Sequence, residues 1–204
     1  MEIIAGDITK YFGEKRILKK INFSISSGES MAIVGPNGSG KTTLMRVLSN
    51  LIQPTHGTVT YKKNGKPIER EKIFQHIGLV GPYLELYQDL TARENLEFFA
   101  KMRGVKNSSE KIAGLMKKLN LAGREEDDVK TYSSGMKQRL KYVFALLDDP
   151  EVLFVDEPRS NLDEQGINTI YDIMRDQKKE KILIIATNDP DDLDFADWTV
   201  PIHA

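Results

Sequence analysis

Short continuous runs of apolar residues recur along this chain, at 31–34, 77–80, 152–155 and 182–185. A run of about four apolar residues is typical of a strand that is covered on both faces of a parallel sheet. Apolar positions at helical spacing fill two of the stretches between these runs, from about 41 to 51 and from about 163 to 179. The pattern predicts an α/β fold around a central parallel sheet.

The first part of the chain has a different pattern. Residues 3–9 and 21–26 alternate apolar and polar positions, as half-buried strands do, and residues 10–20 between them are interpreted as a loop. A further strand is predicted at 58–61, and Asn64-Gly65 is a hairpin turn signal. We therefore expect an antiparallel β subdomain beside the parallel sheet.

Residues from about 84 to 130 are predicted to be mostly helical. Thr91 and Glu94 form a capping box, which opens a helix predicted to run through Met102. We expect one domain over 1–204, with a core at about 1–83 and 131–204 and an inserted helical subdomain at about 84–130.

Composition narrows the function classes. The 204 residues include 29 Lys and Arg against 30 Asp and Glu, so the net charge of −1 gives no electrostatic basis for nucleic acid as a partner. The absence of cysteine excludes disulfides, a thiol nucleophile and cysteine-ligated zinc. With no signal-peptide pattern and no apolar window near the roughly 18 residues of a membrane span, we expect a cytoplasmic chain that reaches a membrane only through a partner.

A glycine-rich segment follows the apolar run 31–34. It reads GPNGSGKTT over residues 35–43 and contains the phosphate-loop pattern G-x-x-x-x-G-K-[ST]. Glycines let backbone N–H groups turn toward phosphate oxygens at a helix N-terminus. Lys41 supplies a charge for the β- and γ-phosphates, and the Thr42 hydroxyl is placed to ligate Mg²⁺. The predicted ATP-binding residues of this loop are Gly35, Pro36, Asn37, Gly38, Ser39, Gly40, Lys41, Thr42 and Thr43.

Two carboxylates, Asp156 and Glu157, follow the apolar run 152–155. A buried strand delivers them to the carboxyl edge of the sheet, where α/β folds bind ligands. Beside a phosphate loop, Asp156 is expected to orient hydrated Mg²⁺ and Glu157 to polarise an attacking water. The alternative is that both acids are solvated turn residues.

Two further motifs make the set of motifs in this chain more specific. Residues 133–139 read S-S-G-M-K-Q-R, and residues 160–163 read S-N-L-D. The order of phosphate loop, S-x-G-x-x-Q-R, D-E-P and S-x-L-D resembles the ATPase subunits of ATP-binding cassette (ABC) transporters, over nearly the whole chain. The resemblance implies an ABC-type phosphate-loop NTPase fold that uses ATP and Mg²⁺.

The resemblance also implies a head-to-tail dimer, either of two copies or with another ABC ATPase, that serves an integral-membrane transporter subunit. In such a dimer Ser133 and Gly135 contact the γ-phosphate bound by the other chain, and Asp163 lies at the dimer seam. Phe12 aligns with the aromatic residue that stacks on adenine, although the adjacent Tyr11, or ordinary packing of either ring, stays open. From the residues alone, Ser133 also suits a simple helix N-cap.

Several positions depart from the family pattern. Residues 133–139 correspond to the signature segment of the family, and in it Ser134 and Met136 replace a glycine and a glutamine. Pro82 stands where the family has a glutamine that contacts Mg²⁺. Proline has no side-chain donor or acceptor, so a water or another group must complete that part of the metal shell.

Asn188 stands where the family has a switch histidine. An amide can donate to the γ-phosphate but cannot carry a positive charge or shuttle a proton, so we predict slow hydrolysis with Glu157 and Asn188 as the catalytic pair. Losing one preorganised donor is worth about 3–4 kcal/mol.

The function is therefore predicted as an ATPase that powers a membrane transporter, with a nucleotide-gated assembly subunit as the alternative and a small-molecule kinase disfavoured by the signature. Its short length and the segment 87–96 make the chain similar to haem-exporter ATPase subunits. The cluster of Tyr83, Leu84, Leu86 and Tyr87 has two interpretations, docking of the membrane subunit or packing under the helical subdomain.

Overall fold

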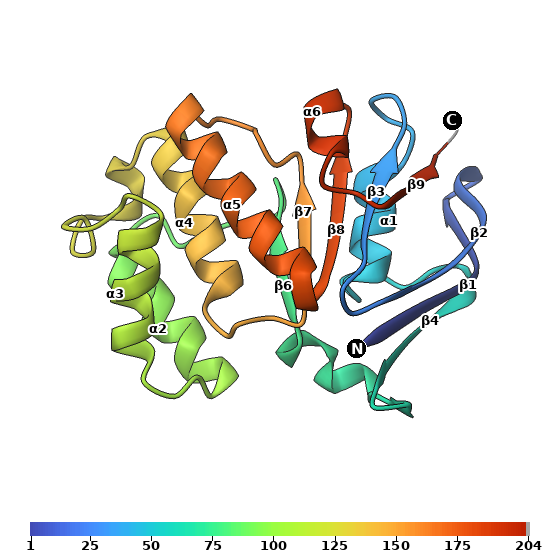
Figure 1. Ribbon diagram of the computed structural model, residues 1–204, viewed down its shortest axis with the longest axis horizontal. Helices are drawn as coiled ribbons and strands as arrows, with labels where there is room; N and C mark the ends of the chain where they lie inside the picture. The colour runs from blue at the N-terminus through green and yellow to red at the C-terminus, as the bar shows by residue number, and fades with distance from the viewer. Residues whose placement is uncertain (203–204) are drawn as a thin grey trace.

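The computed structural model describes residues 1–202 and contains a parallel and an antiparallel sheet (Figure 1). The parallel sheet has the strand order β6-β7-β8-β3-β9. Its strands are β3 (Ser30–Val34), β6 (Ile77–Val80), β7 (Val152–Asp156), β8 (Ile182–Thr187) and β9 (Trp198–Pro201). The four strands predicted from apolar runs are confirmed. Strand β9 escapes prediction because it is a short edge strand in which exposed and half-buried residues alternate.

Alternate residues of the central strands face two separate cores. On one face, Leu153 and Leu183 pack with helices α4 (Ser134–Leu146) and α5 (Glu164–Glu180). On the other face, Phe154 and Ile184 pack with helix α1 (Lys41–Leu48) and the antiparallel sheet. Burial on both faces explains why these strands are apolar at every position. Helix α1 ends earlier than the predicted residue 51, and the chain turns at Asn50, which has φ 63°.

The antiparallel sheet has the order β2-β1-β4-β5. It contains β1 (Glu2–Phe12), β2 (Lys15–Ser26), β4 (His56–Lys63) and β5 (Lys66–Pro67). The prediction of a loop over 10–20 is wrong, because β1 and β2 continue through these residues and meet at a tight turn. Irregular pairing between Ala5 and Tyr11 shifts the side-chain alternation, which hides the strands from a pattern search. The hairpin at Asn64-Gly65 is confirmed by φ values of 52° and 75°.

Helices α4 and α5 and the helices of residues 84–130 lie on the side of the parallel sheet away from the antiparallel sheet, whereas α1 lies between the two sheets (Figure 1). Residues 84–130 form α2 (Ala92–Arg103), α3 (Ser108–Lys118) and the short turn η2 (Val129–Thr131). The capping box of α2 is confirmed, since the Thr91 hydroxyl accepts from the Glu94 N–H at 3.1 Å and the Thr91 N–H donates to the Glu94 carboxylate at 2.8 Å. Shorter helical segments are η1 (Arg70–Gln75) and α6 (Pro190–Leu193). Within residues 1–202, no helix combines the length and the apolarity needed to cross a membrane.

Candidate functional site

The loop between β3 and α1 borders an open hollow through Asn37, Gly38 and Gly40. Gly40 lies just before α1 with φ 112°, and a Cβ there would meet Ile17 Cγ2 at 2.7 Å. A side chain at this position therefore meets both backbone strain and a clash with β2. The loop depends on glycine where it runs into the helix N-terminus, the end of a helix that favours anions.

Lys41 is the first residue of α1, and its side chain curls back over the loop. Its ammonium donates to the Gly35 carbonyl at 2.9 Å and to the Asn188 side-chain oxygen at 2.8 Å. The Asn188 amide also donates to the Asn37 side chain. Lys41, Asn37 and Asn188 therefore form one polar cluster that joins the phosphate loop to the end of β8.

Thr42 and Asp156 meet at the carboxyl edge of the sheet. The Thr42 hydroxyl donates to Asp156 Oδ2 at 2.7 Å, whereas the buried Oδ1 of Asp156 has no partner. Burial raises the pKa of Asp156, against the Thr42 hydrogen bond and the Lys41 charge, which both lower it. A hydroxyl oxygen can ligate Mg²⁺ directly, and a free carboxylate oxygen can accept a hydrogen bond from a water of the metal's shell when phosphates and waters complete that shell. The Thr42 hydroxyl and the Asp156 carboxylate therefore fit Mg²⁺ held together with a nucleotide.

Glu157 follows Asp156 with a left-handed backbone, φ 57°. Its N–H donates to the Ala186 carbonyl at 2.9 Å, which anchors the turn against β8. Burial is the main cause that raises the pKa of Glu157; the Asp156 charge raises it further, and the Lys41 charge opposes both. A non-glycine residue held in this conformation and half buried between charges is typical of functional sites.

A hollow of about 330 Å³ joins these groups. Phe12 lies at its edge with 51% of its surface exposed and the Lys10 ammonium 5.2 Å from the ring centroid. An exposed aromatic ring on the rim of a polar hollow suits stacking on a planar base. The lining residues are Phe12, Ile17, Asn37, Gly38, Gly40, Lys41, Thr42, Thr43 and Glu157.

Three predicted residues lie away from this hollow and close to one another. The Ser133 hydroxyl caps α4 by accepting from the Met136 N–H at 3.2 Å, so the helix-cap interpretation is confirmed as a local interaction. Asp163 caps α5 through the Gly166 N–H at 2.9 Å. A Cβ on Gly135 would lie 2.9 Å from the Asn161 carbonyl, which places the signature segment against the residues before α5. None of the three residues is among those that line the hollow of the phosphate loop.

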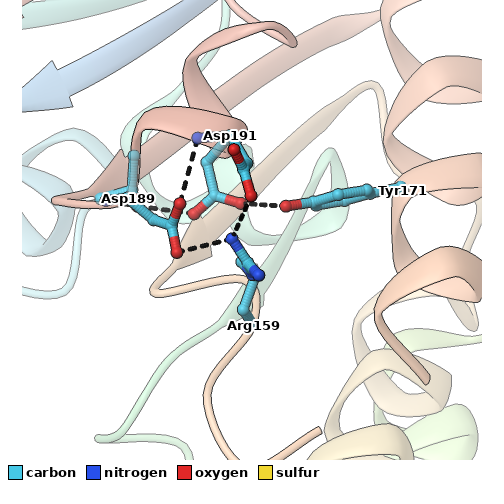
Figure 2. Close-up of polar contacts among 6 residues, drawn as sticks. Arg159, Tyr171, Asp189 and Asp191 are labelled. Atoms are coloured by element: carbon cyan, nitrogen blue, oxygen red, sulfur yellow. Dashed lines mark hydrogen bonds and ion pairs between the residues drawn. The ribbon is translucent and has the colours of Figure 1, made fainter. Parts of the chain in front are cut away.

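A polar network beside Asn188 was missed by sequence reasoning (Figure 2). Arg159 donates to Asp189 at 2.6 Å and to Asp191 at 2.8 Å. Asp192 is 1% exposed and accepts from Tyr171 at 2.9 Å and from the Thr187 hydroxyl at 2.6 Å. The network ties the loop after β7 to the loop after β8, and therefore holds Glu157 and Asn188 in fixed relation. The acid-rich run 189–192 was the only signal, and spacing alone gave it no partner.

Comparisons with known proteins agree with this geometry. Residues 18–160 match the family model described as ABC transporter. The chain is 36% identical over 186 residues to the linearmycin resistance ATP-binding protein LnrL of Bacillus subtilis, covering 90% of this chain and 60% of that protein. It is 33% identical over 182 residues to the lantibiotic transport ATP-binding protein SrtF of Streptococcus pyogenes, covering 89% and 77%. The chain thus spans less than two thirds of LnrL.

Solved structures show the same fold. The structure of an ATP-binding subunit of an ABC transporter matches with a TM-score of 0.90 and 25% identity, over 100% of this chain and 86% of that chain. A dimeric ATP-binding cassette in a post-hydrolysis state, bound to ADP and Pi, matches with a TM-score of 0.87 and 25% identity, over 98% and 94%. This chain belongs to the ATP-binding family of ABC transporters.

Proposed function

We propose that this chain binds and hydrolyses ATP to power an ABC membrane transporter. The observation that carries the proposal is the convergence of Lys41, Thr42 paired with Asp156, and Glu157 on one hollow with Phe12 at its rim. Lys41 and the loop N–H groups bind the phosphates, and Phe12 stacks on the adenine. Pro36 and Ser39 complete the loop as backbone positions. The site takes ATP with Mg²⁺ rather than a free nucleoside because its cationic and N–H groups are concentrated at the phosphate end.

Hydrolysis rests on groups that this chain supplies. Mg²⁺, when bound, offsets the charge that develops on the phosphate oxygens. Asp156 and Thr42 would hold the Mg²⁺ that the nucleotide phosphates bind. Glu157 acts as the general base and accepts a proton from the attacking water. When ATP binds, the Asn188 side-chain N–H leaves its hydrogen bond to Asn37 and donates to the γ-phosphate instead. Because Asn188 stays neutral, we expect the rate to be low.

We propose further that two such chains close head to tail. Ser133 and Gly135 at the start of α4 then face the γ-phosphate of the other chain, and Asp163 lies at the seam between them. The lining of the hollow, which includes none of these three residues, supports this arrangement, as does the similarity to a dimeric cassette. The chain would act at the inner face of a membrane through an integral-membrane partner.

The test is phosphate release by purified protein with Mg·ATP, measured over a range of protein concentrations beside Glu157→Gln. We expect the rate to rise more than linearly with protein and to fall at least about a hundredfold in the variant, the usual contribution of a general base. ATP binding should survive in Glu157→Gln. Equal turnover in both proteins would contradict the role of Glu157.

A second candidate is a nucleotide-gated assembly subunit with vestigial hydrolysis. The observation that favours it is the cluster in which Asn188 binds both Lys41 and Asn37, because an amide supplies a contact to the phosphate without proton chemistry. Tight ATP binding and dimer closure without phosphate release, even with the membrane partner present, would select this candidate.

The surface that meets the partner is proposed to be an aromatic patch formed by Tyr87, Phe98 and Met102. Their exposed fractions are 54%, 46% and 66%, and the rings of Tyr87 and Phe98 lie 5.9 Å apart. Of the cluster predicted from sequence, Leu86 is buried and Tyr83 turns inward, so Tyr87 is left as its exposed aromatic member. A compact apolar patch on a subunit of a membrane transporter suits an apolar helix end of the membrane subunit.

The test of this surface is Tyr87→Ser with Phe98→Ser. We expect the fraction of protein recovered with membrane vesicles from expressing cells to fall at least about tenfold, because each ring is worth about 1–3 kcal/mol when buried. ATP affinity should not change. Leu51→Ser is the control, since Leu51 is also 54% exposed but lies in the turn that follows α1, outside the patch. Equal losses in both proteins would contradict a specific docking patch.

A further inference from the structure

Few buried side-chain atoms of this protein lack a hydrogen-bond partner. Within residues 1–202 they are Ser39 Oγ, Arg46 Nε, Tyr83 Oη and Asp156 Oδ1. An unpaired buried polar atom is costly, so native proteins keep few of them. Ser39 belongs to the phosphate loop and Asp156 to the candidate metal site. Tyr83 has no such role, and its unpaired hydroxyl points to a missing partner.

The strand register brings Tyr83 to the metal site. Val80 at the end of β6 pairs with Val155 of β7, so the next residue, Gly81, lies beside Asp156. Tyr83 then folds back over Gly81, where a Cβ would meet the tyrosine ring at 2.8 Å. The absence of a side chain at Gly81 is what lets the ring approach. Pro82 between them is exposed and carries no polar side-chain group.

Helix α1 fixes the ring from the other side. The Arg46 guanidinium carbon lies 5.8 Å from the centre of the Tyr83 ring. Arg46 is one helical turn after Thr42, so both side chains share a face of α1. The ring is therefore held between the strand that ends at Gly81 and the helix face that carries Thr42.

The chemistry of the phenol suits a neutral hydrogen-bonding group. Burial is the main cause that raises the pKa of Tyr83, and the nearby charge of Asp156 raises it further, while Arg46 opposes both. The hydroxyl therefore stays protonated and available at neutral pH. A water in the shell of a bound Mg²⁺ has two hydrogens to donate, and two unpaired oxygens lie here to accept them.

We propose that Tyr83 is a positioning residue of the Mg·ATP site, whose hydroxyl oxygen accepts a hydrogen bond from a metal-bound water that also donates to Asp156 Oδ1. Tyr83 supplies the polar contact that Pro82 cannot make. The role rests on the proposed binding of Mg·ATP, and it deepens that proposal by naming a further residue of the metal shell.

The test is Tyr83→Phe, which removes the hydroxyl and keeps the ring over Gly81 and Arg46. In the ligand-free protein the variant loses an unpaired buried oxygen, so its Tm should rise by about 2 °C. Binding of Mn²⁺·ATP, followed by the electron paramagnetic resonance of Mn²⁺, should weaken about fivefold, the usual value of one hydrogen bond. Binding of ATP with chelator present should change less than about twofold. Tyr87→Phe is the matched control and should change none of the three.

Opposite signs in the two measurements separate a ligand role from a packing role. A lower Tm with unchanged Mn²⁺·ATP binding would overturn the proposal, because it would mean that the hydroxyl serves the fold. Unchanged Mn²⁺·ATP binding at a raised Tm would overturn it as well. If the unaltered protein bound neither ATP nor Mn²⁺·ATP, that result would contradict both the proposed function and the proposed role of Tyr83.

Discussion

Neighbouring acids can serve different purposes when their surroundings differ, and Asp156 and Glu157 illustrate this at the scale of the residue. Asp156 ends β7 and is 2% exposed, with one oxygen held by Thr42. Glu157 leaves the strand through a left-handed turn and reaches the hollow that Phe12 and Lys41 line. In the proposed mechanism, the strand end therefore separates the carboxylate that faces the metal from the carboxylate that faces the attacking water by a single residue.

The raised pKa of Glu157 predicts the pH dependence of hydrolysis. A general base must be ionised, so the rate should fall as the pH drops through a pKa above the ordinary value of 4.5. The measurement is the rate of phosphate release from about pH 4 to pH 9 at saturating Mg·ATP. A rate that holds constant down to the ordinary pKa of a glutamate would show that Glu157 does not act as the base.

The same shift affects stability, with the opposite dependence on pH. A carboxyl whose pKa is raised on folding binds its proton more tightly in the folded state, so its stabilisation is present at low pH and is lost as the pH rises through the folded pKa. Glu157→Gln stays neutral and avoids that loss. We expect the variant to have the higher Tm at pH 8 and the same Tm as the unaltered protein below about pH 4.

At the scale of the element, sequence patterns predicted those strands and helix ends that are determined by burial or by local backbone hydrogen bonds. The strands at 152–155 and 182–185 are apolar at each position because both faces are covered, and Thr91 signals the start of α2 through its own hydrogen bond. Residues 10–20 were mistaken for a loop, since bulged pairing removes the alternation on which a strand is recognised. The strand conformation of those residues is set by their pairing in the sheet.

The site was predictable to the extent that it lies on local motifs. The phosphate loop and the two acids could be placed because each follows a recognisable strand. Arg159, Asp192 and Tyr171 could not, because their hydrogen bonds join three segments whose proximity depends on the whole sheet. The proposed role of Tyr83 likewise could not be predicted, because it depends on the register of β6 on β7.

Thr91→Ala tests the local stability of α2. The capping box satisfies two backbone N–H groups, so losing the hydroxyl should lower the free energy of unfolding by about 1 kcal/mol. Thr169→Ala is the control: the Thr169 hydroxyl bonds the Gln165 carbonyl within α5, and its removal should be close to neutral. Denaturant unfolding measures both values. Equal effects would mean that the cap adds nothing beyond an ordinary exposed threonine.

At the scale of the whole molecule, the separation of two groups of residues is the main feature. Lys41, Thr42 and Glu157 surround the hollow, whereas Ser133 and Gly135 lie at the start of α4 outside it. If a symmetric pair of chains completes each site, every site takes its phosphate loop from one chain and its signature from the other. A lesion in each group then has a distinct outcome when two variants are mixed.

Mixing Lys41→Ala with Gly135→Asp tests this arrangement. Each variant alone should be inactive, because both sites of its own dimer carry the lesion. In a mixed dimer one site collects both lesions and the other has none. If chains pair at random and sites act independently, half of the dimers have one working site, so the mixture should recover about a quarter of the activity.

Lys41→Ala mixed with Glu157→Gln is the matched control. Both lesions lie on the phosphate-loop side of the hollow, so a mixed dimer carries one lesion in each site and should stay inactive. Differently tagged chains would verify that mixed dimers form in both experiments. Recovery only in the Gly135 mixture requires that the signature acts across the dimer, since no arrangement confined to one chain restores a site from two defective chains. Failure of that mixture to recover, with mixed dimers present, would mean that Gly135 serves the phosphate loop of its own chain.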